Sequence, residues 1–117
     1  MEDHAIVFAD TAGIIRYWSS GAEEFFGYTE AEAVGQSLDI IVPVEFRERH
    51  WAGFRAAMGT GVSRLNGAAH PGLPVQCKDG LVRQFPGRLI LLRDPQGHAV
   101  GAVAVYARAG VSNPLTL

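Results

Sequence analysis

The chain opens with two short apolar runs, at residues 5–9 and 14–18, separated by Asp-Thr-Ala-Gly at residues 10–13. β-Branched and aromatic runs on both sides of a turn with glycine at its last position are typical of a β-hairpin. We therefore expect two antiparallel strands at the start of the chain.

Capping signals follow the hairpin. Ser20 with Glu23, and Thr29 with Glu32, have the spacing of a capping box, in which the hydroxyl accepts from a free N–H and the glutamate reaches back. Each pair predicts the start of a short helix. Gly27 is well placed to end the first helix, because glycine is common just past a helix C-terminus.

A longer helix is expected next. Gly35 ends the second short helix, and Pro43 can open the longer one at its first turn, where a missing N–H costs nothing. Apolar residues between positions 44 and 58 can form the buried face, and Gly-Thr-Gly at 59–61 closes the helix.

The second half of the chain changes to a strand pattern. Proline and glycine punctuate residues 65–87, and turn signals occur at 78–80 and 94–97. Residues 89–92 are expected to form a buried strand, and residues 99–107 a final strand. Two strands, a helical middle and three further strands predict an α+β fold, with helices on one face of a five-stranded antiparallel sheet.

Composition agrees with one folded domain. The 117 residues are 48% hydrophobic and 19% charged, which suits a globular core and differs from the signature of disorder. We predict a single domain over 1–117, with a core at about 4–108 and a C-terminal tail at 109–117.

Charge and hydropathy argue against nucleic-acid binding and against a membrane-spanning segment. The net charge is −2 and the ten basic residues are dispersed, whereas nucleic-acid binding needs a clustered basic surface. Residues 65–77, which no uncharged stretch of the chain exceeds in length, contain glycines and prolines and cannot be a membrane span. Glu2 and Asp3 stand where a signal peptide would be basic, so we expect a cytoplasmic protein.

The sequence carries no pattern typical of an enzyme. It lacks a Gly-x-Ser-x-Gly elbow, a phosphate-binding glycine loop and a His-Glu-x-x-His pair. Turn and capping roles account for Asp10, Glu23 and Glu24. Cys77 is the only cysteine, which excludes an internal disulfide and a cysteine metal cluster, and we interpret it as a buried, inert thiol.

A spaced set of residues resembles the N-terminal signature of PAS domains: Asp10, Gly13, Ile15, Trp18, Gly21, Ala22, Glu23, Phe26, Gly27, Tyr28, Thr29, Glu32 and Gly35. Lys-Asp-Gly at 78–80 resembles the strand-turn signature of the same family, and the likeness spans about residues 4–108. The resemblance implies a pocket between sheet and helices, and signalling through strands or flanking helices with no chemistry required.

The resemblance also indicates which PAS ligand classes to expect. The flavin-binding, light-sensing subclass needs a cysteine after Gly35, and residues 36–38 contain none. The cinnamoyl photoreceptors need a chromophore-bearing cysteine, and the surroundings of Cys77 do not match theirs. We therefore expect no flavin.

Residues 43–50 are similar to a segment of heme-binding PAS oxygen sensors, in which a helix histidine is the proximal iron ligand. His50 lies seven residues beyond Pro43 and matches that histidine. The resemblance implies heme b and a diatomic ligand, O2, CO or NO. It assigns further residues around the heme: Arg64 beside a propionate, Leu65, Leu89 and Leu91 on the apolar distal wall, and His70 near the position of a distal arginine.

A heme-free interpretation stays open. The stretch Arg-His-x-x-Gly-Phe at 49–54 also resembles many PAS domains for which heme is not expected. There, His50 would be a half-buried helix residue, His70 a loop residue, and Arg64 a solvated charge. The protein would then be an interaction or dimerisation module that binds a small organic ligand or none.

The end of the chain departs from the family pattern. Many PAS domains that feed an effector leave the last strand with an Asp-aliphatic-Thr motif, whereas residues 106–110 read Tyr-Ala-Arg-Ala-Gly. We expect either a domain excised from a longer protein or a free-standing sensor. In both cases we expect the signal to pass to the second copy in a homodimer or to a signalling partner protein.

Overall fold

The two ends of the chain meet in the middle of one antiparallel sheet, in the strand order β2-β1-β5-β4-β3. The computed structural model describes residues 1–63 and 67–108. Its strands are β1 (His4–Ala9), β2 (Ile15–Trp18), β3 (Ala69–Gln76), β4 (Val82–Arg93) and β5 (Ala99–Ala107). The predicted α+β fold with a five-stranded antiparallel sheet is confirmed.

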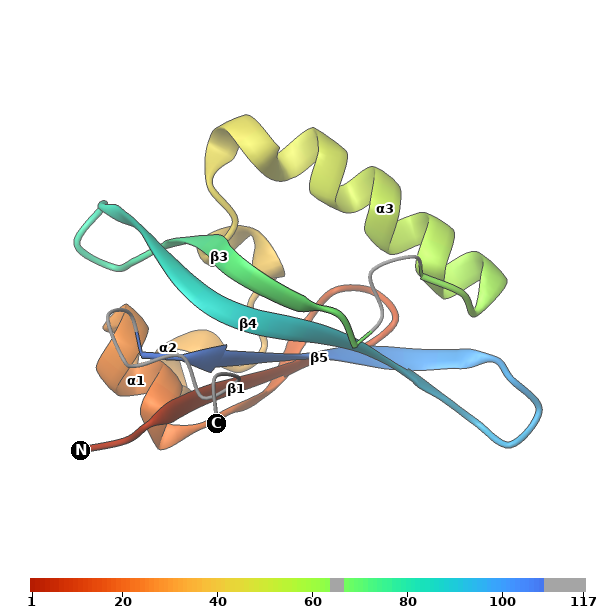
Figure 1. Cartoon of the computed structure of the whole chain (residues 1–117), viewed down its shortest axis with the longest axis horizontal. Helices are drawn as coiled ribbons and strands as arrows, with labels where there is room; N and C mark the ends of the chain where they lie inside the picture. Colours follow the sequence, from red (N-terminus) through yellow and green to blue (C-terminus); the bar gives the residue numbers. More distant parts are fainter. Residues whose placement is uncertain (64–66, 109–117) are drawn as a thin grey trace.

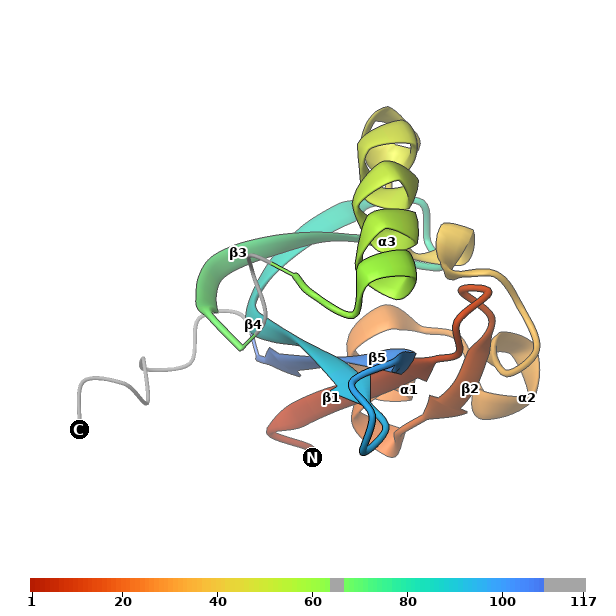
Figure 2. The ribbon, with the colours of Figure 1, turned by 90° about the vertical axis from the view of Figure 1, so that its right-hand side faces the viewer.

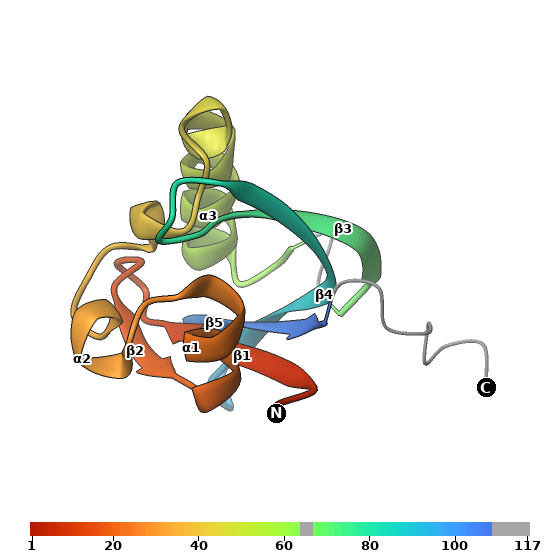
Figure 3. The ribbon, with the colours of Figure 1, turned by 90° about the vertical axis from the view of Figure 1, so that its left-hand side faces the viewer.

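All the helical segments of the described residues lie between β2 and β3. They are α1 (Ser20–Phe26), α2 (Glu30–Ala33), the 3₁₀ turns η1 (Leu38–Ile40) and η2 (Val44–Phe46), and α3 (Arg47–Thr60). Figure 1 shows α3 running along the sheet, with α1 near the start of β1. Seen from both sides, β3 and β4 curve toward α3, so the sheet is concave on its helical side (Figures 2 and 3).

The concave face carries the core. Along β1 the alternate residues Ala5, Val7 and Ala9 are buried, as expected when successive side chains point to opposite faces. An aromatic cluster packs at the α1 end, where the Phe26 ring lies 5.1 Å from Tyr106 and 5.3 Å from Phe85 in edge-to-face geometry. Such pairs contribute beyond their buried area, so this end is the packed part of the domain.

One of the two predicted capping boxes is present. The Thr29 hydroxyl accepts from the Glu32 N–H, and the Glu32 carboxylate accepts from the Thr29 N–H. The box predicted at Ser20 is wrong, because Ser19 is the N-cap and its hydroxyl accepts from Ala22. The Ser19 hydroxyl also accepts from Ile6 on β1, which shifts the helix start by one residue.

Two further predictions need correction. Pro43 opens the 3₁₀ turn η2, and α3 begins only at Arg47. The strand predicted to be buried at 89–92 is not uniformly so: Leu91 is 8% exposed, whereas Leu89 is 39% and Leu92 36% exposed. Leu92 points to the uncovered face of the sheet, and Leu89 borders a cavity described below.

Helix α1 packs directly on the backbone of β1 through Gly21. A Cβ atom at this position would lie 1.7 Å from the carbonyl oxygen of His4. Backbone atoms cannot give way as a flexible side chain would, so only glycine fits here.

We predict that Gly21→Ala lowers the free energy of unfolding by at least about 1–3 kcal/mol, the usual cost of overpacking. Gly53→Ala is the matched control, because a Cβ atom on this α3 glycine meets nothing within 4 Å. That change should raise stability by up to about 1 kcal/mol through helix propensity. Urea denaturation followed by circular dichroism measures both, and similar shifts in the two variants would contradict the close contact.

Candidate ligand-binding site

A cavity of about 410 Å³ separates α3 from the concave face of the sheet. This volume lies within the range of roughly 300–1,000 Å³ that small-molecule sites occupy. Its walls come from β1, the segment from η1 to α3, and strands β3 to β5. The cavity adjoins the α1 aromatic cluster, because Tyr106 of that cluster also lines it.

Strand register places small residues at the centre of the cavity floor. One row across the sheet runs from Val7 through Ala104 to Leu89, and the next runs from Ala9 through Ala102 to Leu91. All six side chains line the cavity. The middle strand, β5, therefore contributes alanines to the centre of the floor, with Val7 and Leu89 beside one and Ala9 and Leu91 beside the other.

The roof is the inward face of α3 and the turn before it. Its lining residues are spaced by three and one along the sequence, which places them on one side of a helix. They are Phe46, Arg49, His50, Gly53, Phe54, Ala57 and Met58. The roof is therefore apolar except at two adjacent positions, Arg49 and His50.

His50 is partly buried among aromatic rings on this roof. Its imidazole lies 4.8 Å from the Trp51 ring and stacks on Phe54 at 5.9 Å with an interplanar angle of 27°. The buried Nδ1 atom has no hydrogen-bond partner among the described residues. Burial lowers the pKa of His50 below its ordinary value of 6.5, and the nearby Asp39 carboxylate opposes part of this shift. The neutral imidazole is thus the favoured form at pH 7.

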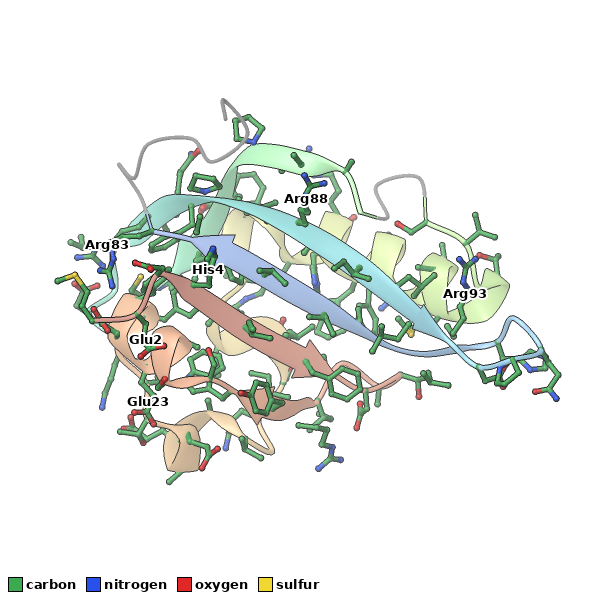
Figure 4. All side chains as sticks on the ribbon, turned by 60° about the horizontal axis from the view of Figure 1, so that its bottom comes forward. Glu2, His4, Glu23, Arg83, Arg88 and Arg93 are labelled. Atoms are coloured by element: carbon green, nitrogen blue, oxygen red, sulfur yellow. The ribbon has the colours of Figure 1, made fainter. Side chains whose placement is uncertain are left out.

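Hydrogen bonds anchor α3 at both ends of the cavity. The Trp51 indole N–H donates to the Asp39 carboxylate at 2.7 Å, and its ring packs against the β1–β2 turn at Gly13. Toward the other end, the Arg93 guanidinium on β4 donates to the Gly61 carbonyl at 3.1 Å (Figure 4). These contacts set the distance between helix and sheet.

Two polar side chains of other elements also reach the cavity wall. Tyr106 belongs to the aromatic cluster as well, and burial raises the pKa of its phenol, which stays protonated at neutral pH. Ser63, just after α3, is the other. The wall can therefore bind a mainly apolar molecule with a few polar groups.

The residues assigned from the sequence divide into three groups. His50, Leu89 and Leu91 all line the cavity. His70 does not: it is exposed and lies in β3, not in a loop, with its Nδ1 accepting from the Gly72 N–H at 3.4 Å. Arg64 and Leu65 fall outside the described residues.

Sequence reasoning found Leu89 and Leu91 on the floor of the cavity but missed the floor residues of β1 and β5 and two roof residues, Arg49 and Gly53. Gly53 and Phe54 lie three and four residues after His50, so counting at helical spacing from His50 would have found them, whereas Arg49 directly precedes His50. The pairing of Ala102 and Ala104 with the flanking strands depends on register, which carries no local signal.

Over residues 1–63 and 67–108, the structure gathers no group of three His, Cys, Asp or Glu side chains suited to a metal ion. In the same part of the chain, no helix is long and apolar enough to cross a membrane.

A family model described as the PAS fold matches residues 2–106. The sensor protein FixL of Bradyrhizobium diazoefficiens is 44% identical over 46 residues, which are 39% of this chain and 9% of that protein. The chain spans 8–9% of the length of the curated relatives it matches.

Solved structures share the fold at low identity. A PAS domain from Colwellia psychrerythraea superposes with a TM-score of 0.72 at 21% identity, covering 88% of this chain and 83% of that one. The PAS domain of the RpfR quorum-sensing receptor of Cronobacter turicensis, in complex with C12:0, gives 0.66 at 16% identity, with coverages of 93% and 96%.

The lowered pKa of His50 predicts a pH dependence. As the pH falls below about 6.5, the unfolded chain binds the proton before the folded chain does, so the free energy of unfolding should decrease toward the folded-state pKa of His50. His50→Gln should remove this component. Denaturation series between pH 7 and pH 5 test this, and NMR titration of His50 at or above 6.5 would contradict it.

Proposed function

Because this chain belongs to the PAS family, we propose that it is a sensory domain that binds heme b with His50 as the iron ligand. In this proposal the domain detects a diatomic gas or a redox change and reports it to a partner protein or a second copy. The observation that carries the proposal is the partnerless, buried Nδ1 of His50 on the wall of an apolar cavity. No hydrogen bond at Nδ1 holds the imidazole in place, so turning the ring toward a ligand would break none there.

The residues of the cavity fit such a group. Neutral imidazole is the form that binds iron, and burial favours it at His50. The apolar floor suits a macrocycle, and the bare backbone at Gly53 leaves room beside the histidine. When bound, the heme would supply the iron that takes O2, CO or NO or changes oxidation state. Leu65, Leu89 and Leu91 would shape the distal side, and Arg64 would pair with a propionate.

The proposed signal travels from α3 to the sheet. His50 is adjacent to Trp51, whose hydrogen bond to Asp39 links the helix to η1, and Arg93 links the helix end to β4. A shift of α3 on ligand binding would change these anchors and the strand positions together. A dimer or partner contacting the sheet would receive the change.

The alternative function is heme-free binding of an organic ligand. The apolar walls and the volume of about 410 Å³ favour it, and the RpfR PAS domain, which shares the fold, is in complex with C12:0. In this case His50 would contribute one polar contact to a ligand and no metal bond.

We expect purified protein with added hemin to give a sharp Soret band that shifts on dithionite reduction and again with CO. His50→Ala should lose this band while the domain stays folded by circular dichroism. His70→Ala is the matched control, since that histidine is exposed and lies outside the cavity lining, and it should keep the wild-type spectrum.

Equal heme content in wild type and His50→Ala would disprove the iron-ligand assignment. A spectrum that hemin changes no more than it changes an unrelated control protein would favour the heme-free alternative. Native mass spectrometry of the protein as isolated would then identify the retained organic molecule by its mass.

A further inference from the structure

Arg49 is the single fully charged side chain among the described residues that line the cavity. Its guanidinium lies 5.3 Å over the Phe46 ring, and it makes no ion pair or hydrogen bond within the described part of the chain. Every other α3 residue on this wall except His50 is apolar or glycine. A cation at the rim of an apolar chamber is suited to bind an anionic group of a ligand.

Several other arginines are already paired within the protein. Arg16 contacts Asp10 at 2.8 Å, Arg83 contacts Asp79 at 2.8 Å, and Arg108 contacts Glu24 at 2.6 Å. Arg55 is also on α3 but does not line the cavity. The position of Arg49, together with its lack of a carboxylate partner in the described structure, sets it apart from these.

Gly53 is costly for the fold and is not required by it. Glycine inside a helix is less stable than alanine by up to about 1 kcal/mol. Its φ is not positive, and an added Cβ would meet no heavy atom within 4 Å, so neither backbone conformation nor close packing requires glycine. The residue lines the cavity one turn from Arg49, where the missing side chain leaves bare helix backbone facing a ligand.

We infer that the cavity takes an acidic amphiphile, whose carboxylate pairs with Arg49 at the rim and whose apolar body packs against Gly53. This rests on the proposed role of the cavity as the sensory site. A porphyrin with propionates and a free long-chain carboxylic acid share this chemistry. For heme, which has two propionates, Arg49 would act in addition to Arg64.

The test compares acids with their neutral esters. Hemin and hemin dimethyl ester are titrated by absorbance, and dodecanoate and methyl dodecanoate by tryptophan fluorescence, below their aggregation limits. Arg49→Gln should weaken binding of whichever acid the wild type binds by about tenfold, because one charge-assisted hydrogen bond is lost. The affinity for the corresponding ester should stay unchanged. Arg55→Gln is the matched control and should change neither.

A second variant tests the packing against Gly53. Gly53→Leu adds a side chain where space is open and improves helix propensity, so the domain should remain folded. Gly53→Leu should weaken binding of the acid and of its ester alike by at least tenfold, because the added side chain occupies the volume that the ligand would fill. Unchanged affinity in Gly53→Leu, or equal loss of acid and ester in Arg49→Gln, would overturn the inference.

The outcomes separate this inference from the heme proposal. If His50→Ala abolishes hemin binding and Arg49→Gln has no effect, the heme proposal stands and the inference is wrong. If hemin fails to bind but dodecanoate binds with Arg49 dependence, the inference stands and the heme assignment is wrong. If neither acid binds the wild type, both are wrong.

Discussion

Helix α3 is held to the domain by hydrogen bonds near its ends, while its middle stands away from the sheet. The Trp51 indole donates to Asp39 near the start, and Arg93 donates to Gly61 at the end. Between these anchors a helical glycine and a floor centred on two alanines line a cavity of about 410 Å³. The anchors thus keep an apolar cavity open, although closing it would gain dispersion contacts. The ligand site depends on this arrangement.

The packed and open parts of the concave face have different physical roles. At the α1 end, edge-to-face rings and the close approach of Gly21 to β1 form a closely packed core. At the α3 end, a ligand would supply contacts that the protein lacks. Tyr106 belongs to both parts, since it contacts Phe26 and lines the cavity. Its strand, β5, therefore connects the ligand site to the core.

The chemistry of the site follows from two adjacent residues in different environments. His50 lies among the rings of Trp51 and Phe54, where desolvation favours the neutral imidazole. Arg49 is exposed at the rim and keeps its charge in contact with water. The neutral imidazole inside the cavity and the guanidinium at its rim are complementary to an apolar molecule with an acidic end. This polarity would let one helix face orient a ligand in a cavity whose other described lining residues, apart from Ser63 and Tyr106, are apolar.

The sequence alone determined the features that depend on near neighbours in the chain. Strand and helix order, the Thr29 capping box and the helix ends at Gly27 and Gly61 follow from periodicity and turn chemistry. The family pattern added His50, which the structure places on the cavity wall. The choice of Ser19 over Ser20 as a cap needed the contact of α1 with β1. Only the tertiary structure decided three features: the alanine floor, the exposure of Leu89 and the position of Arg49 at the cavity rim. They depend on strand register, sheet curvature and helix position, which arise from contacts between distant segments.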